Sequence, residues 1–421
     1  MWRSQFLRNV LFAGSGTAIS HVLLFATLPL LAKLYTPNDF GVFALYTAAI
    51  GFGSLIATLQ FDSTILIASN SIKAIRLLVA VLYIAMAAGG TAMVLAISAA
   101  VVAGTFGIAH LPAWTFLLPI HLTILGSSQA IRVWRIRIAG FAVVSKAVAV
   151  RAFIATACSL IVIAAFPTIG SAGLIVSQFL GDFALLVVLL WGIDFRRILL
   201  VMRHGRKKVI ATSLVYRNQG SAWFFTYLMS TIWAHIPVYA ITAGFGATSA
   251  GYYSMAERIS FAPSQLVSQA IADVFRQRAA DMHRSGHRFD RLFLRVLLGT
   301  TAVAAPCFLL GASFAPTLFA VTLGGEWRPA GETASIILIY SLLAFIDRPV
   351  QYTTFIFGIV AYPLAINSVR LSGELTLAAV AAFRIVTFHD YLLLACVWRS
   401  AFYVTDMTFT YFLSRRLPMP T

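Results

Sequence analysis

The sequence predicts an all-α membrane protein with about twelve transmembrane helices, arranged as two six-helix bundles. Three observations support this fold class. Hydrophobic residues make up 60% of the 421 residues and charged residues only 11%, which is more apolar surface than a soluble core can bury. Apolar stretches of spanning length recur along the whole chain. Most of the Lys and Arg residues fall in alternate loops between these stretches.

A helix that crosses a bilayer needs roughly twenty predominantly apolar residues. In the first half of the chain such stretches cover residues 9–32, 40–68, 77–103, 112–131, 146–166 and 171–193. In the second half they cover residues 216–243, 249–275, 292–320, 332–357, 362–383 and 389–413. We therefore expect an N-terminal bundle over residues 1–195, a basic cytoplasmic linker over 196–215, and a C-terminal bundle over 216–421.

The loop charges predict the orientation, because Lys and Arg near helix ends stay in the cytoplasm. If the N-terminus is cytoplasmic, the opposite loops hold only Lys33, Arg328 and Arg384. Both termini are then cytoplasmic, and the chain is a multi-pass protein of the inner (plasma) membrane. The net charge of +17 is scattered among short loops, so we expect no nucleic-acid partner, which would need a continuous basic surface.

A faint internal repeat relates the two halves. Pro29 ends one apolar stretch and is followed by a short loop and Gly41, and Pro237 and Gly251 repeat this order in the second half. Because each half has an even number of helices, both halves begin on the same side. This predicts a parallel repeat about an axis normal to the membrane, which is one of the transporter architectures.

Several kinds of chemistry are not expected. Cys158, Cys307 and Cys396 lie alone in apolar stretches, so neither a disulfide framework nor a metal site is predicted. There is no phosphate-binding GxxxxGK[ST] loop, and the short loops leave no room for a soluble catalytic domain. No cleavable signal is apparent, and we expect no cofactor and no enzyme activity.

The stretch 249–275 carries the most informative polar residues. Arg258, Gln265, Gln269 and Arg276 fall close to one line along a helix, with Asp273 to its side. A cation and two amides on one face suit a cavity that binds a phosphate and sugar hydroxyls. The alternative is structural: Glu257 neutralises its neighbour Arg258, the amides bond between helices, and the last two charges sit at the inner interface.

The later stretches carry further charges. Asp347 and Arg348 precede Pro349, which suits a gate or a cation site, or equally a self-compensated charge near the cytoplasmic end. Glu374 follows Arg370 by four residues, a spacing that favours a structural ion pair within one helix.

Arg399 and Asp406, seven residues apart, also share a helix face and suit a structural pair. Asp62 and Asp182 have no opposite charge nearby in sequence, so either residue could carry a proton or bind sodium. Asp62 could instead reach cytoplasmic water, and Asp182 could pair with an arginine of another helix. The candidates for ion coupling are Asp62, Asp182, Asp273, Asp347 and Glu374.

The stretch from Leu30 to Tyr46, which reads LLAKLYTPNDFGVFALY, resembles the opening of the polysaccharide transporter family. These are the Wzx-like O-antigen and exopolysaccharide flippases of the multidrug/oligosaccharidyl-lipid/polysaccharide exporter superfamily. The segments GYYSMAERI from Gly251 and GEWRPAG from Gly325 resemble the same family. The resemblance covers nearly the whole chain.

This resemblance implies a two-bundle fold around a cationic cavity. It implies alternating access that moves an undecaprenyl-diphosphate-linked oligosaccharide between leaflets for O-antigen, capsule or exopolysaccharide synthesis, with proton or sodium antiport. We expect Arg258 and, less strongly, Arg348 to attract the diphosphate while Gln265 and Gln269 contact sugar. A polysaccharide polymerase and a chain-length regulator are possible partners, besides membrane lipid. The alternatives are a multidrug or toxin antiporter of the same superfamily and a membrane-embedded polymerase.

Overall fold

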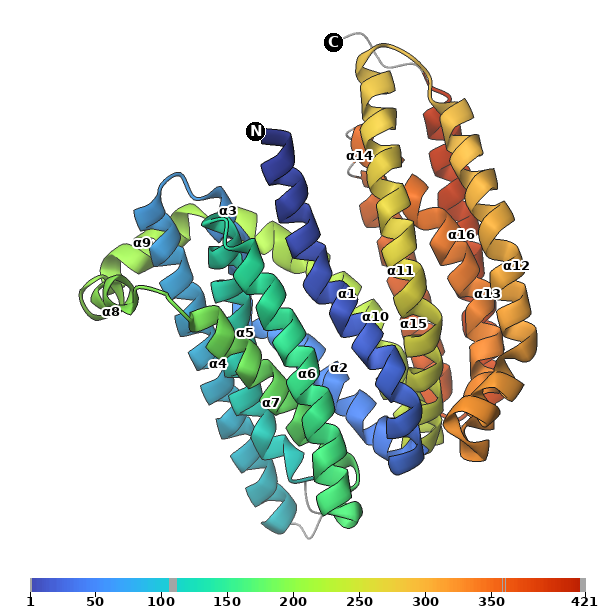
Figure 1. Ribbon diagram of the computed structural model, residues 1–421, viewed down its shortest axis with the longest axis horizontal. Helices are drawn as coiled ribbons and strands as arrows, with labels where there is room; N and C mark the ends of the chain where they lie inside the picture. Colours follow the sequence, from blue (N-terminus) through green and yellow to red (C-terminus); the bar gives the residue numbers. More distant parts are fainter. Residues whose placement is uncertain (1, 106–111, 358, 360, 417–421) are drawn as a thin grey trace. The chain divides into compact units, whose positions relative to one another are not determined.

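The computed structural model describes residues 2–105, 112–357, 359 and 361–416. This part of the chain forms α-helices and short 3-10 turns and contains no strand, which confirms the all-α prediction. Contacts divide the helices into two compact units. Unit 1 comprises Met1–Leu34 and Leu45–His235, and unit 2 comprises Tyr35–Ala44 and Ile236–Thr421. Figure 1 labels the helices along the chain.

Unit 1 contains most of the first half of the chain. Its helices are α1 (Trp2–Leu34), α3 (Thr64–Ile67), α4 (Ser71–Thr105), α5 (Trp114–Arg137), α6 (Phe141–Ala165), α7 (Ser171–Leu190), α8 (Phe195–His204) and α9 (Arg206–Val215), with short turns η1 (Phe61–Ser63) and η2 (Pro167–Ile169). It also holds most of α2 (Pro37–Thr58) and of α10 (Arg217–Phe245). Helix α6 packs between α1 and α7, and α4 packs along α5.

Unit 2 is built around one central helix. Its helices are α11 (Ala247–Arg284), α12 (Asp290–Leu323), α13 (Arg328–Val350), α14 (Thr353–Ile356), α15 (Ala361–Ala382) and α16 (Phe388–Ser414), with the turn η3 (Gly325–Trp327). Helix α13 packs against α11, α12 and α16, and α15 packs against α16. The start of α2 and the end of α10 also belong to this unit.

The long helices match the predicted stretches closely, but two of the predicted helices are interrupted. The stretch 40–68 divides into α2, η1 and α3, because Leu59 and Gln60 adopt left-handed backbone angles, with φ of 46° and 57°. The stretch 332–357 likewise ends early, at Val350, and continues as the short helix α14. The segment predicted as a basic linker folds into the two ten-residue helices α8 and α9.

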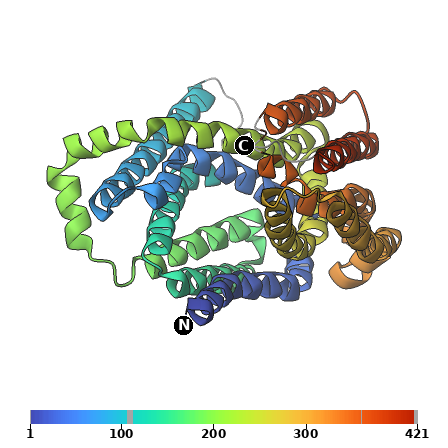
Figure 2. The same cartoon turned by 90° about the horizontal axis from the view of Figure 1, so that it is seen from above.

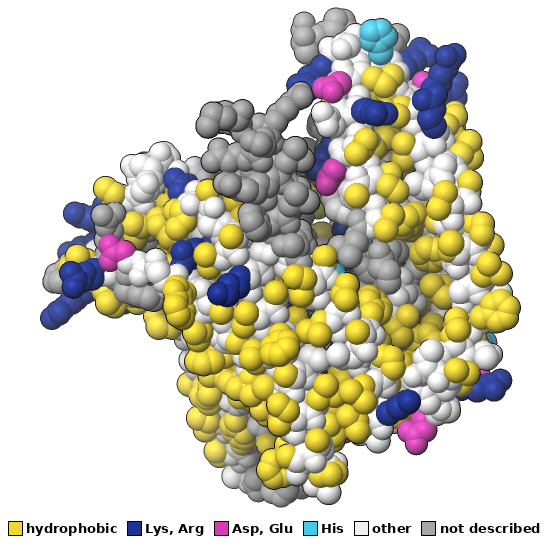
Figure 3. All heavy atoms as spheres, in the orientation of Figure 1, with side chains coloured by type: hydrophobic (Ala, Val, Ile, Leu, Met, Phe, Trp, Pro, Cys, Tyr) yellow, Lys and Arg dark blue, Asp and Glu magenta, His cyan; other side chains and the backbone are white. Residues whose placement is uncertain are grey.

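Nine of the described helices are long and apolar enough to cross a membrane. Helices α11, α15 and α16 are not among them, and each carries charged residues along its length. In each unit, hydrophobic side chains cover much of the face shown in Figure 3, and most Lys and Arg on that face lie toward helix ends. This distribution fits a chain whose solvent is lipid.

Glycine allows an unusually close helix crossing inside unit 2. A Cβ atom at Gly41 of α2 would lie 1.7 Å from the carbonyl oxygen of Ala247, and one at Gly251 of α11 would lie 1.8 Å from that of Pro37. No side chain fits at these distances, so the two glycines let the backbones of α2 and α11 touch. Both belong to the segments that carry the family resemblance.

Candidate functional site

The charged residues of unit 2 come from four of its helices, α11, α13, α15 and α16, and several of them meet in its interior. Arg399 of α16 is the centre of one group. Its Nε donates to Glu374 Oε1 at 2.7 Å and its Nη2 donates to Glu374 Oε2 at 3.0 Å. The two side chains are 4% and 0% exposed. A two-pronged arginine–carboxylate contact of this kind is the strongest geometry for such a pair.

Two tyrosines complete the coordination of this arginine. Nη1 of Arg399 donates to the hydroxyl of Tyr340 on α13 at 2.9 Å and to that of Tyr253 on α11 at 3.2 Å. The Tyr253 hydroxyl in turn donates to Glu257 Oε1 at 3.3 Å. One arginine thus ties four helices together through buried polar contacts. We name Glu257, Tyr253, Tyr340, Glu374 and Arg399 the arginine network.

The arginine network replaces both ion pairs that the sequence suggested, Arg370 with Glu374 and Arg399 with Asp406, because Arg399 pairs with Glu374. Glu374 pairs with Arg399 of the neighbouring helix and not with Arg370, four residues before it. Arg370 instead donates to the Tyr403 hydroxyl at 3.3 Å and lies 4.4 Å from the Phe402 ring centre. Spacing along one helix identifies which side chains share a face. It does not identify a better partner on another helix.

A second group of polar residues joins α13 to the second half of α11. Arg348 Nε donates to Gln269 Oε1 at 3.4 Å, and Gln269 Nε2 donates to Asp273 Oδ1 at 3.2 Å. Arg276 donates to the same carboxylate oxygen at 2.5 Å. The structure therefore brings together Arg348, Gln269 and Asp273, which the sequence had singled out on two separate helices. We name these three residues with Arg276 the amide chain.

The other two predicted cavity residues lie outside the amide chain. The Arg258 guanidinium lies 5.7 Å from the ring centre of Phe43, which belongs to the same unit. Gln265 is exposed. Among the described residues, neither Arg258 nor Arg348 forms an ion pair within 4.0 Å of a carboxylate. The carboxyl groups next to them in the chain, those of Glu257 and Asp347, still interact with them electrostatically.

Two buried carboxyl groups form a third group. Asp347 of α13 and Asp406 of α16 are 3% and 7% exposed, and their carboxyl groups lie near enough to interact electrostatically. Oδ1 of Asp347 has no hydrogen-bond partner among the described residues. Two neighbouring buried carboxylates repel each other unless they share a proton or a cation. The sequence had assigned Asp347 to its neighbour Arg348 and Asp406 to Arg399, so this pairing was missed.

Unit 1 holds a separate buried group around Asp182 of α7. Its carboxylate contacts Arg151 Nε at 2.5 Å and His121 Nε2 at 2.9 Å, and Gln178 Nε2 donates to it at 2.9 Å. His121 Nδ1 also lies 2.8 Å from the Tyr46 hydroxyl. Asp182 therefore has an arginine partner from another helix, which was one of the two alternatives. Sequence analysis did not single out His121, because nothing near it in sequence suggests a partner.

Asp62, the remaining ion-coupling candidate, lies in the turn η1 that interrupts the second predicted helix. It is half-buried, and its Oδ1 has no hydrogen-bond partner among the described residues. Its place in a turn explains why a charge is tolerated at this point of an apolar stretch. The peptide groups of a turn offer polar contacts that a continuous helix lacks.

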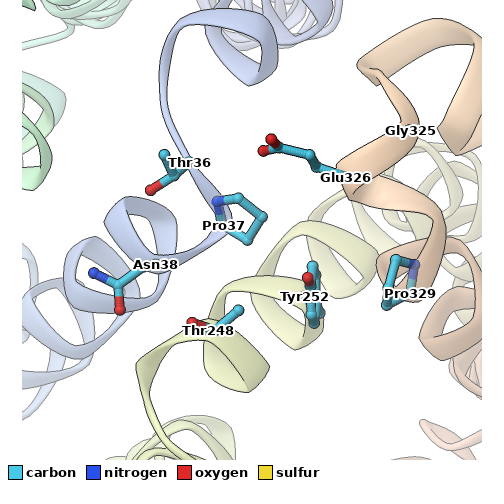
Figure 4. Close-up of a pocket in the computed structure, with 8 residues that line it drawn as sticks. All are labelled: Thr36, Pro37, Asn38, Thr248, Tyr252, Gly325, Glu326 and Pro329. Carbon is cyan, nitrogen blue, oxygen red and sulfur yellow. The ribbon is translucent and has the colours of Figure 1, made fainter.

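An open pocket of mixed polar and apolar lining lies in unit 2 where α2 and α11 begin (Figure 4). It has a volume of about 540 Å³ and is lined by Thr36, Pro37, Asn38, Thr248, Tyr252, Gly325, Glu326 and Pro329. Trp327, which is 1% exposed, lies behind it with its ring centre 5.2 Å from Phe40 and 6.4 Å from Tyr252. None of the predicted site residues lines this pocket.

One comparison with known proteins identifies the family of the chain, and another identifies its fold. A family model described as "Polysaccharide biosynthesis protein" matches residues 30–332. No curated protein matches the chain.

Among solved structures, the chain is similar to an inward-facing multidrug resistance MATE family transporter of the MOP superfamily. The identity is 13%, the match covers 96% of this chain and 94% of that one, and the TM-score is 0.59. It is also similar to a MATE protein in complex with MaL6, at 10% identity, with 96% and 95% covered and a TM-score of 0.52. At these identities the likeness shows a shared fold. Because the family model spans well over half of its length, the chain belongs to the polysaccharide biosynthesis protein family.

Proposed function

We propose that this protein is a flippase that moves an undecaprenyl-diphosphate-linked oligosaccharide from the cytoplasmic leaflet to the opposite leaflet of the inner membrane. The product would feed the synthesis of O-antigen, capsule or exopolysaccharide. The observation that carries the proposal is that a member of a polysaccharide biosynthesis protein family has the MATE fold and carries Arg258 and Arg348 in unit 2 without an ion pair within 4.0 Å among its described residues. A diphosphate is the ligand that such cations suit.

The proposal includes the membrane topology. The twelve long helices α1, α2, α4, α5, α6, α7, α10, α11, α12, α13, α15 and α16 would each cross the bilayer. They would form two six-helix bundles related by a parallel repeat, bounded near residues 195 and 216, with both termini in the cytoplasm. The polyprenyl tail would stay in lipid, because it is apolar along its whole length.

The polar groups of unit 2 suggest how the head group would be held. Arg348 and Arg258 would attract the diphosphate, and Gln269 and Gln265 would donate to sugar hydroxyls. Because Gln269 already accepts from Arg348 at 3.4 Å, a bound anion would compete for that guanidinium and release the amide to the sugar. The carboxyl pair Asp347–Asp406 and the group around Asp182 would exchange protons or sodium during the transport cycle.

The first test uses a strain that lacks this gene. We expect lipid-linked oligosaccharide to accumulate on the cytoplasmic leaflet and the surface polysaccharide to disappear. Oligosaccharide on the outer leaflet, with polymer lost, would contradict the proposal and favour the polymerase alternative. Formation of new glycosidic bonds by the purified protein and a lipid-linked donor would do the same.

The second test asks whether the two cations act. Arg258→Ala and Arg348→Gln should each abolish export while the protein remains at normal abundance in the membrane. Arg328→Gln is the control, because that side chain is 68% exposed and lies 3.7 Å from Glu332 at a helix start. Normal export in a cation variant would remove that residue from the mechanism.

A multidrug or toxin antiporter is the alternative favoured by the shared fold, since one similar structure is a multidrug resistance transporter. The buried carboxyl groups of Asp347 and Asp406 are the groups of unit 2 that a cationic drug would suit. Unchanged drug sensitivity of the deletion strain would exclude this alternative. Increased sensitivity with normal surface polysaccharide would establish it.

A further inference from the structure

The segment between the two halves of the chain is folded and held against unit 1. Ile198 of α8 and Val209 of α9 are buried in the same apolar cluster as residues of α4, α5 and α7. The hydroxyl of Tyr83 on α4 donates to the carbonyl oxygen of Met202 at 2.9 Å. Tyr216, just after α9, accepts from the backbone N–H of Ser69 at 3.3 Å. Helices α8 and α9 therefore have a defined position on unit 1.

Helix α8 lies across the long helices of unit 1. Figure 1 shows α8 almost end-on, whereas α4, α6 and α7 run within the plane of the page. In Figure 2, after a quarter turn, α8 is seen along its length. If the long helices cross the bilayer, α8 lies parallel to the bilayer surface.

The outward sides of α8 and α9 combine two kinds of side chain. The apolar residues Leu199 and Leu200 of α8 are 59% and 61% exposed, and Trp191, just before this helix, is 81% exposed. Further exposed apolar residues on α9 are Ile210, Leu214 and Val215. The exposed basic residues of the same segment are Arg196, Arg203, Arg206, Lys207, Lys208 and Arg217.

The segment 191–217 contains a single acidic residue, Asp194. Its carboxylate accepts the backbone N–H of Arg196 at the start of α8, so it caps the helix. The basic side chains thus face outward with little local compensation. Figure 3 shows dark-blue and yellow spheres together at the left edge, where Figure 1 places α8.

Exposed leucines and a tryptophan are unfavourable in water but stable at the boundary between head groups and acyl chains. Arginine and lysine beside them are attracted to acidic head groups. Such a mixture on a helix parallel to the membrane fits a lipid surface. It does not suit nucleic acid, which would not cover the leucines.

We propose that α8 and α9 form a binding surface for the head groups of acidic phospholipids, with Leu199, Leu200 and Trp191 seated in the interfacial layer. This surface holds unit 1 and the start of the second half of the chain to one leaflet. The inference depends on the protein lying in a membrane and is independent of which substrate it moves.

The test uses the full-length protein in nanodiscs of phosphatidylcholine alone and of phosphatidylcholine with phosphatidylglycerol. Hydrogen exchange of the backbone amides of residues 195–215 is measured in both. We expect slower exchange in the acidic discs, and this difference should shrink at high salt because exposed charges are screened. Equal exchange in both kinds of disc would overturn the proposal.

A charge variant and a matched control make the test specific. The triple variant Arg206→Gln, Lys207→Gln, Lys208→Gln should abolish the lipid-dependent difference, because each basic residue near an acidic surface contributes roughly fivefold in affinity. The control Arg288→Gln, Arg291→Gln, Arg295→Gln removes three exposed arginines from unit 2 and should leave the difference at 195–215 unchanged. Loss of the difference in both variants would overturn the proposal, since any basic loop would then act alike.

The variant Leu199→Ser, Leu200→Ser tests the apolar part. Because the chain has 8 tryptophans, the contribution of Trp191 is taken as the part of the quenching by brominated lipid that Trp191→Phe removes. We expect Leu199→Ser, Leu200→Ser to lower this part relative to the parent protein. Unchanged quenching would show that the leucines do not seat this segment in the interface and would overturn that part of the proposal.

Discussion

The pair Arg399–Glu374 allows the sharpest test of how unit 2 is held together. We consider Arg399→Met, which keeps an unbranched side chain but removes its charge and its donors. The change leaves Glu374 buried with no cation in contact, and it also removes the donors to Tyr253 and Tyr340.

The expected loss of stability is large. Removing one partner of a buried ion pair costs about 3–5 kcal/mol, because the remaining charge loses its compensation without regaining water. The two tyrosine hydroxyls add on the order of 1 kcal/mol each. We therefore expect Arg399→Met to lose about 5–7 kcal/mol, enough to lower the amount of folded protein in the membrane.

The double variant Arg399→Met, Glu374→Leu separates the pair from its surroundings. Replacing both charges by apolar residues of similar size is often close to neutral. We expect the double variant to recover all but about 2 kcal/mol of the loss. A double variant as unstable as the sum of the two single variants would refute this reasoning.

Thermal unfolding in detergent, followed by tryptophan fluorescence, measures all four proteins of this cycle. Export by the double variant then decides the role of Glu374. Normal export would leave Glu374 with a structural role and remove it from the ion-coupling candidates. Lost export at normal stability would keep it among them.

Three further predictions concern other contacts. Gly41→Ala should destabilise the protein by well over about 3 kcal/mol and lower its abundance, since its Cβ would lie 1.7 Å from a carbonyl oxygen. At the control position Gly299, a Cβ would meet no atom within 4 Å, so Gly299→Ala should raise the stability by about 0.5–1 kcal/mol. Asp182→Asn should lose about 3 kcal/mol of stability, because charged hydrogen bonds to Arg151 and His121 are removed. The control Asp62→Asn should change the stability by under about 1 kcal/mol. Equal thermal midpoints of the two variants would contradict this prediction. Gln269→Ala should weaken export less than Arg348→Gln, because the amide would contact neutral hydroxyls and the arginine would contact a charge. Export is assayed at matched protein abundance, and the reverse order would contradict this prediction.

Helix periodicity and local composition carried most of the fold prediction. Runs of apolar residues predicted the long helices, and Pro37, Gly41 and Gly251 marked the segments that identify the family. These features are local, and a helix satisfies its own backbone hydrogen bonds, so its existence depends little on distant residues. The interruption at Leu59 and Gln60 was not predicted, because neither residue is one that usually adopts a left-handed backbone.

Composition, helix periodicity and family resemblance were enough to predict a helical chain that is apolar enough for a membrane, and they identified Arg348, Gln269, Asp273 and Asp182 as residues of interest. The partners of the charged residues followed from the fold. It placed Glu374 beside Arg399, Asp347 near Asp406, and Asp182 beside His121 and Arg151. Spacing along the chain tells only which side chains share one face of a helix. Which faces of two helices meet depends on packing between segments that are 25 to 61 residues apart.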